Sequence, residues 1–276
     1  MTAQRLQHFE VFFPAVFVAA LQQQWPTVRA VFLQDFDSPV IALAPRWLLE
    51  AQDGQYGLAL AATDLLHSSR QTVADPLQTL LALWQPRGHA SPVAPAGFQG
   101  GLAGFLGHEL MAAHTLGLPC PQPDSALGGL WVGEFAVFLR ADPGGGWTLY
   151  GPDQPELQTL YQAIAHCATV TAQAEPLQLQ GPFTPRWSPA QYQAAFAQVQ
   201  AYLQAGDCYQ VNLTQPFEAD VTGSLLSVAA SLWQYSRAPF AGWLQMGGGE
   251  ELLSCSPELF LALDAQQQVR TRPIKG

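Results

Sequence analysis

The order of helical and extended patterns along the chain is the feature that most restricts its fold. Short apolar runs at 28–33, 39–44 and 130–139, bounded by proline, aspartate or glycine, predict buried strands. Apolar residues three or four positions apart predict helices at 75–84 and 155–168. Strands and helices follow one another without strict alternation, so we expect an α+β fold rather than a doubly wound parallel sheet.

The best-marked helix begins near Ser188. Pro189 stands at the first helical position, and Gln191 completes a capping box with the serine. The polar, proline-containing segment before it shows no periodicity and is a candidate linker. We therefore divide the chain into a first region, a linker and a second region, at 1–175, 176–187 and 188–276.

Composition excludes two classes of partner. The chain has 276 residues, with 21 acidic and 11 basic side chains and a formal net charge of −10, and its basic residues form no stripe. A protein that tracks nucleic-acid phosphates is therefore not expected. The first long apolar run, 11–21, contains Pro14 and is shorter than the roughly 20 residues that span a bilayer, so no membrane partner is expected either.

Cysteine usage indicates the compartment. Cys120, Cys167, Cys208 and Cys255 are far apart and show no metal-binding spacing. Free thiols are typical of a reducing compartment, so we expect a cytoplasmic protein. Reading the run at 11–21 as a secretory signal is the less favoured alternative, because polar residues flank it without a clear cleavage site.

The segment 206–215 has strand-like alternation, and we expect a strand at 208–217. Tyr209 and Val211 would face one side, while Gln210, Asn212 and Thr214 would face the other. A row of neutral hydrogen-bonding groups is compatible with a solvated outer face. It is equally compatible with the floor of a pocket for a polar small molecule.

Two further residues are candidates for chemistry. Glu258 lies between apolar runs, where burial would raise its pKa and make it a proton donor, although an exposed turn after Pro257 is equally compatible. Lys275 is the only lysine of the chain and stands between Ile274 and Gly276. A partly desolvated lysine amine is nucleophilic, whereas the same residue near a chain end could simply be disordered.

Several blocks of the sequence resemble the chorismate-utilising enzymes. The resemblance rests on residues 206–215, Arg237-Ala238-Pro239-Phe240, Ser256-Pro257-Glu258 and Thr271-Arg272-Pro273-Ile274-Lys275-Gly276, with 75–78 and 98–101 in the same order upstream. The lysine of the last block is typical of the aminodeoxychorismate synthase branch of the family. Anthranilate synthases, which are similar elsewhere, typically have alanine there.

The resemblance implies two packed antiparallel β-sheets with surrounding helices. It also implies a transferase that aminates chorismate at C4, giving 4-amino-4-deoxychorismate for 4-aminobenzoate and folate biosynthesis. Lys275 would be the nucleophile, Glu258 the proton donor, and Gln210 and Asn212 part of the substrate pocket. An anthranilate synthase component I fragment is the alternative enzyme.

The same resemblance implies cofactors and partners. Ammonia would come from a separate glutamine amidotransferase subunit, and Mg²⁺ would be held by residues of a C-terminal half not in this sequence, so no metal ligand is assigned here. Family members also hold tryptophan in the first domain, at positions matching Ser38, Pro239 and Phe240. We expect the chain to be an N-terminal part that is inactive alone. The alternative is a catalytically incompetent fragment that binds tryptophan or the partner.

Overall fold

The computed structural model describes residues 4–10, 12, 14–34, 38–65, 68–84, 98–123, 129–170, 176–246, 249–263 and 268–274. It divides the chain into two compact units. The larger unit contains residues 1–174 and 225–276, and the smaller unit contains residues 175–224. The sequence-based division at 175 and 187 stays a prediction.

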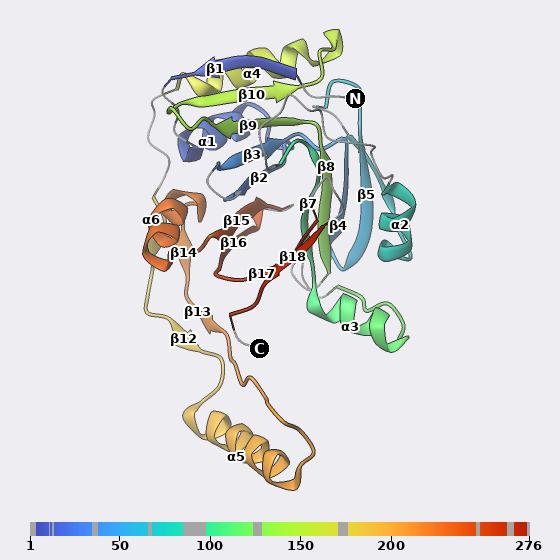
Figure 1. Cartoon of the computed structure of the whole chain (residues 1–276), viewed down its shortest axis with the longest axis vertical. Helices are drawn as coiled ribbons and strands as arrows, with labels where there is room; N and C mark the ends of the chain where they lie inside the picture. The colour runs from blue at the N-terminus through green and yellow to red at the C-terminus, as the bar shows by residue number, and fades with distance from the viewer. Residues whose placement is uncertain are drawn as a thin grey trace. The chain divides into compact units, whose positions relative to one another are not determined.

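The larger unit contains a seven-stranded antiparallel sheet that joins distant parts of the chain. Figure 1 shows blue, yellow-green and orange-red strands side by side in it. In spatial order, its strands are β1 (Gln4–Phe9), β10 (Trp147–Gly151), β9 (Val137–Ala141), β3 (Val40–Leu43), β2 (Ala30–Leu33), β15 (Phe240–Gln245) and β16 (Glu251–Ser256). The predicted strands at 28–33 and 39–44 are confirmed as β2 and β3, which lie near the middle of this sheet.

A second antiparallel sheet has five strands. In spatial order, they are β6 (Ser68–Thr72), β5 (Gln55–Ala61), β4 (Trp47–Gln52), β8 (Leu130–Phe135) and β7 (Gly101–Leu106). Strands β4 and β5 are joined by Asp53 and Gly54, which both have positive φ angles (54° and 72°). Two positive φ values are typical of the tight hairpin turn that matches strand twist.

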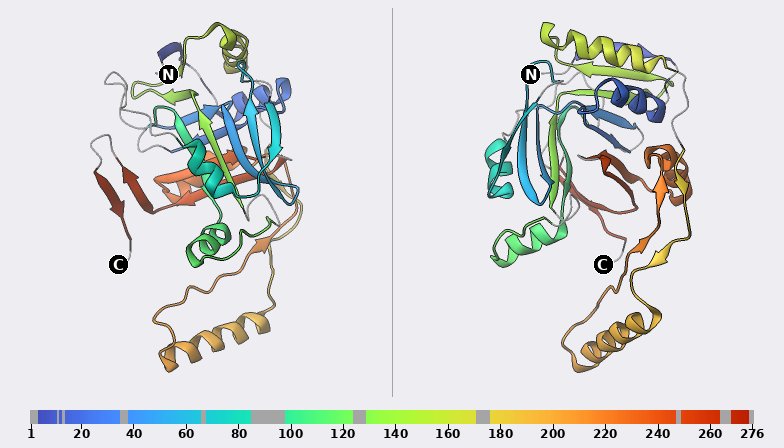
Figure 2. Two further views of the ribbon diagram at one scale, coloured as in Figure 1. Left: turned by 90° about the vertical axis from the view of Figure 1, so that its right-hand side faces the viewer. Right: turned by 180° about the vertical axis from the view of Figure 1, so that it is seen from behind.

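The two sheets pack against each other. One cluster of buried side chains draws Val31, Val40 and Leu244 from the seven-stranded sheet and Leu48 and Trp131 from the five-stranded sheet. Figure 2 shows the strands of both sheets from two further sides. The predicted α+β fold with two packed antiparallel sheets is confirmed.

Helices cover the outer faces of both sheets. On the seven-stranded sheet lie α1 (Pro14–Gln24), α4 (Gln158–Ala168), preceded by the 3₁₀ turn η2 (Pro155–Leu157), and α6 (Leu226–Ser236). On the five-stranded sheet lie α2 (Pro76–Leu83) and α3 (His108–Leu116). The predicted helices at 75–84 and 155–168 are therefore confirmed, and Asp75 caps α2 by accepting a 2.9 Å hydrogen bond from Gln78 N.

A two-stranded hairpin, β17 (Leu259–Leu263) and β18 (Val269–Arg272), follows β16 along the chain. Its two strands pair in antiparallel register, with Leu259 opposite Arg272. This register fixes which residues share one end of the hairpin.

The smaller unit contains α5 (Pro189–Ala205) and two short strand pairs. Ser188 and Gln191 form the predicted capping box, and Gly206 ends the helix in the left-handed conformation (φ 80°). The pairs are β11 (Gln178–Leu179) with β14 (Val221–Thr222), and β12 (Thr184–Pro185) with β13 (Phe217–Glu218). The predicted linker therefore includes two short strands.

The predicted strand at 208–217 is wrong for all but its last residue, because only Phe217 belongs to a strand. The predicted core-facing side is also not buried, since Tyr209 is 96% and Val211 41% exposed. Alternation alone does not make a strand. The backbone groups need a neighbouring strand for their hydrogen bonds, and none pairs with this segment in the described part of the chain.

Candidate active site

Glu258 lies in the short connection between β16 and β17. Its backbone N donates a 3.3 Å hydrogen bond to Ser256 Oγ, and that hydroxyl donates to Glu258 O at 3.2 Å. The Glu258 side chain itself is exposed. Of the two arrangements compatible with the sequence, the structure therefore has the exposed turn, with the backbone held by Ser256.

The β17–β18 hairpin brings the residues around Glu258 and Pro273 to one end. Leu259 is opposite Arg272 in this hairpin. Glu258, which precedes Leu259, and Pro273, which follows Arg272, therefore lie at the same end of the strand pair. Thr271 Oγ1 also donates a hydrogen bond to Leu259 O at 3.3 Å. Lys275 and Gly276 lie outside the described residues.

Gln210 and Asn212 belong to the smaller unit, on the extended connection between α5 and β13. Both side chains are exposed. The far end of this connection is held by Gln215, whose Oε1 accepts a 3.1 Å hydrogen bond from Trp187 N. These two amides and Glu258 are thus carried by different units of the chain.

Ser38, Pro239 and Phe240 gather at one end of the seven-stranded sheet. Leu33 of β2 is in register with Val40 on one side and with Gly242 on the other. Ser38 and Phe240 each lie two residues before those partners, so they flank the end of β2 from opposite sides. Ser38 is fixed there by a 2.8 Å hydrogen bond from its Oγ to Ala141 O.

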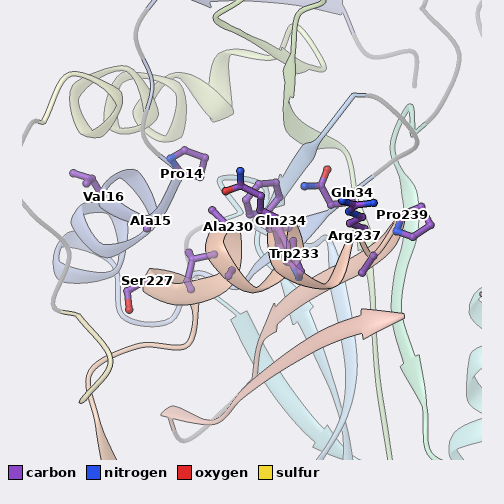
Figure 3. A pocket seen from close by; sticks show the side chains of 14 residues that line it. Pro14, Ala15, Val16, Gln34, Ser227, Ala230, Trp233, Gln234, Arg237 and Pro239 are labelled. Atoms are coloured by element: carbon purple, nitrogen blue, oxygen red, sulfur yellow. The ribbon is translucent and has the colours of Figure 1, made fainter. Parts of the chain in front are cut away.

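A pocket of about 630 Å³ opens beside this end of the sheet, between α1, α6 and β2. Its walls include Phe32 and Trp233, whose rings meet edge to face with centroids 5.0 Å apart. Figure 3 shows Gln34, Arg237 and Pro239 together at one end of the pocket. The size and apolar walls suit a small organic ligand, and the guanidinium suits a ligand with a carboxylate.

Sequence reasoning did not single out Arg237 as a functional residue. It is the C-cap of α6 and adopts a left-handed backbone conformation (φ 50°), which residues other than glycine rarely adopt. Its neighbours in the pocket come from α1 and β2, about 200 residues earlier in the chain. No local pattern signals a contact of that kind.

The described residues do not fit a carboxylate-held magnesium ion. Among them, no three His, Cys, Asp or Glu side chains come together in a group that could hold a metal. Within the same residues, no helix has the length and apolar character needed to cross a bilayer.

The fold is that of a known class of enzyme. The chain superposes on anthranilate synthase component I from Streptococcus pneumoniae with a TM-score of 0.63 and 17% sequence identity, covering 82% of this chain and 52% of that one. At that identity the likeness establishes the fold alone.

The sequence establishes the family. The model for chorismate binding enzymes matches residues 44–276, so the chain belongs to the chorismate binding enzyme family. It is 32% identical to aminodeoxychorismate synthase component 1 of Salmonella typhimurium and 33% identical to that of Escherichia coli, in each case over 74% of this chain and 44% of the relative. Anthranilate synthase component 1 of Streptomyces coelicolor is 27% identical over 74% of this chain and 43% of that protein. The chain thus spans less than half the length of these relatives.

Proposed function

We propose that this chain is the part of an aminodeoxychorismate synthase component 1 that carries its nucleophile and its acid. The Pro273-Ile274-Lys275-Gly276 sequence carries the proposal, because its lysine is the only one in the chain and is typical of that branch. Relatives 32–34% identical bear that name, whereas the anthranilate synthase relative is 27% identical.

In the proposed reaction, the amine of Lys275 attacks C2 of chorismate. The ring double bonds shift, and the C4 hydroxyl leaves as water after taking a proton from Glu258. Ammonia then attacks C4, and the reverse shift of the double bonds expels the lysine amine. One ammonia is consumed and one water is released, giving 4-amino-4-deoxychorismate.

The hairpin register supports pairing these two residues. Glu258 and Pro273 flank the same strand pair, and Lys275 is only two residues beyond Pro273. Two residues of chain span at most about 7 Å, so the sequence separation of Lys275 from Pro273 is compatible with this pairing. The flexible four-carbon stem of a lysine side chain gives it further reach.

We assign Gln210 and Asn212 to the polar groups of chorismate. Each amide offers both donors and an acceptor, which suits a substrate with hydroxyl and carboxylate oxygens. Their exposure leaves these groups available to a ligand. Replacing either amide by leucine should raise the KM for chorismate.

Further parts of the proposal concern partners and cofactor. We infer that a glutamine amidotransferase subunit delivers the ammonia, since relatives are named as component 1 of their synthase. Mg²⁺ ligands are expected from the part of the relatives that this chain does not match, and no step here depends on that ion.

The sheet end that carries Ser38, Pro239 and Phe240 is proposed to bind tryptophan. The adjoining pocket supports this, because Phe32 and Trp233 offer aromatic surface to an indole while Arg237 offers a cation to its carboxylate.

Product identity tests the function. A chimera in which this chain replaces the matched part of the Escherichia coli relative is incubated with chorismate, ammonia and Mg²⁺. Chromatography with mass detection should show 4-amino-4-deoxychorismate. Anthranilate as the main product, which its fluorescence reveals, would support the alternative enzyme. A folded chimera that makes neither product would contradict the proposal.

A further inference from the structure

A second cavity, of about 160 Å³, lies on the face of the five-stranded sheet that is turned toward β2 and β3. Strand β4 lines it with every second residue, Leu48, Glu50 and Gln52, as the alternation of a strand requires. Strand β5 contributes only the small side chains of Ala59 and Ala61. These small residues leave space above the sheet, and the Glu50 side chain lines that space.

Glu50 is unusual because it is a buried carboxylate with an unused oxygen. It is 4% exposed, and its Oε2 has no hydrogen-bond partner among the described residues. Burial raises the pKa of this carboxyl. The charges of Arg29 and Arg70 and the nearby Trp131 indole oppose the rise, and the charge of Asp53 reinforces it. An unsatisfied buried acceptor is rare in native proteins and destabilising, so this oxygen needs a donor.

Two arginines line the same cavity. Arg29 is held by hydrogen bonds from Nη1 to Pro26 O (3.4 Å) and Thr27 O (3.2 Å), while its buried Nε has no partner among the described residues. Arg70 lies across Gly57, since a Cβ added to that glycine would be 2.4 Å from Arg70 Nε. Gly57 is directly opposite Glu50 in the β4–β5 pair. The cavity therefore presents one unused acceptor and one unused donor, with two cations.

Backbone strain also gathers here. Ala44 and Leu65 line the cavity and have positive φ angles of 49° and 57°. Such conformations are strained for residues other than glycine and tend to cluster where a site is held in shape.

We infer that this cavity binds a small α-amino acid, with its carboxylate at Arg29 and Arg70 and its ammonium group on Oε2 of Glu50. A zwitterion satisfies the unused donor and the unused acceptor together. A simple carboxylate would leave Glu50 without a donor, and a simple amine would leave Arg29 without an acceptor. The inference is independent of the proposed synthase function.

The cavity also limits the side chain of the ligand. Its volume equals that of about five waters at roughly 30 Å³ each, which admits alanine but not an indole. Val28, Pro45 and Leu48 provide apolar wall for a methyl group. L-alanine is therefore the probe of choice, and the site is distinct from the pocket assigned to tryptophan.

Isothermal titration of the full chain tests the inference. L-alanine should bind with one-to-one stoichiometry, whereas propionate, which lacks the ammonium group, and ethylamine, which lacks the carboxylate, should not bind measurably. Absence of binding by L-alanine, or equal binding of propionate, would overturn the inference and indicate a cavity filled by water only.

Variants locate the site. Glu50→Gln keeps the shape of the side chain but removes its charge. It should lower the affinity for L-alanine about tenfold or more. Gly57→Ala should do the same, because the new Cβ displaces Arg70. Gly144→Ala is the matched control, since its Cβ meets nothing within 4 Å. Unchanged affinity in both Glu50→Gln and Gly57→Ala would overturn the assignment even if L-alanine binds the protein elsewhere.

Discussion

Trp243 donates a hydrogen bond from its indole Nε1 to Oε2 of Glu251, 3.2 Å away across the β15–β16 hairpin. The same carboxylate oxygen accepts a 2.6 Å hydrogen bond from Leu225 N, just before α6. One side chain thus ties the hairpin to the start of the helix that walls the larger pocket. Trp243 is fully buried, so its indole has no access to water as a substitute acceptor.

Glu251→Ala should therefore lower the free energy of unfolding by about 1–3 kcal/mol, the range for losing an acceptor that serves buried donors. Urea denaturation followed by tryptophan fluorescence measures it. Glu250→Ala is the control, because the neighbouring side chain is exposed. Equal midpoints for the two variants would show that the Glu251 contacts are not stabilising.

Glu50 should make stability depend on pH in a particular direction. Burial raises its pKa above the ordinary 4.5 in the folded state. Folding therefore favours the protonated form, and the stability that this contributes is complete below about pH 4.5 and is lost as the pH rises through the raised value. Glu50→Gln mimics the neutral form, so it should be more stable than the wild type at pH 7.5 and show a smaller advantage at pH 4. Urea melts at both pH values measure it, and a difference independent of pH would contradict the raised pKa.

Removal of the Tyr161 hydroxyl should destabilise the protein. The buried Tyr161 hydroxyl donates a 2.6 Å hydrogen bond to Pro152 O, and burial raises its pKa to about 12. Tyr161→Phe should lower the free energy of unfolding by about 1 kcal/mol at pH 7. Tyr235→Phe, at a side chain that is 91% exposed, should leave it unchanged.

The raised pKa of Tyr161 has its own readout. Because the folded-state value lies above the ordinary 10, this tyrosine contributes stability that is lost as the pH rises from about 10 to 12. Absorbance titration of the phenolates should show fewer groups ionising near pH 10 in the wild type than after unfolding in denaturant, and Tyr161 is one of the missing groups. Tyr56, also raised to about 12, should add a second such group.

Arg237 should be needed for tryptophan binding. Arg237→Met removes the cation at the end of the larger pocket while keeping an apolar stem, so the affinity for L-tryptophan should fall about tenfold. Arg270→Met, on the exposed β18 strand, is the control. Calorimetry that finds the same affinity in both variants would place tryptophan elsewhere.

Local sequence patterns predicted those elements well whose formation depends on residues close together in the chain. The capping box at Ser188 and the Asp75-Pro76 helix start follow from hydrogen bonds within one turn, and both are present. Apolar runs such as 39–44 predicted strands because those strands are buried on both faces.

Contacts between distant parts of the chain carry no such local signal. The run 130–139 is split between β8 and β9, which belong to different sheets, because the chain crosses from one layer to the other at Ala136. The pairing of β2 with β15 joins segments about 200 residues apart, so the grouping of Ser38 with Phe240 rested on resemblance alone. Glu50 was not singled out, because only the packing of β2 and β3 over β4 shows that it is buried.

Lys275 is the proposed nucleophile, and intact-mass spectrometry of the chimera tests this assignment most directly. Chorismate without ammonia should add a covalent mass to the wild-type chimera. Lys275→Ala should remove that adduct and strongly reduce 4-amino-4-deoxychorismate formation, while Glu258→Gln should slow formation of the adduct. A Lys275→Ala variant that keeps full aminodeoxychorismate activity would contradict the nucleophile assignment and the branch assignment with it.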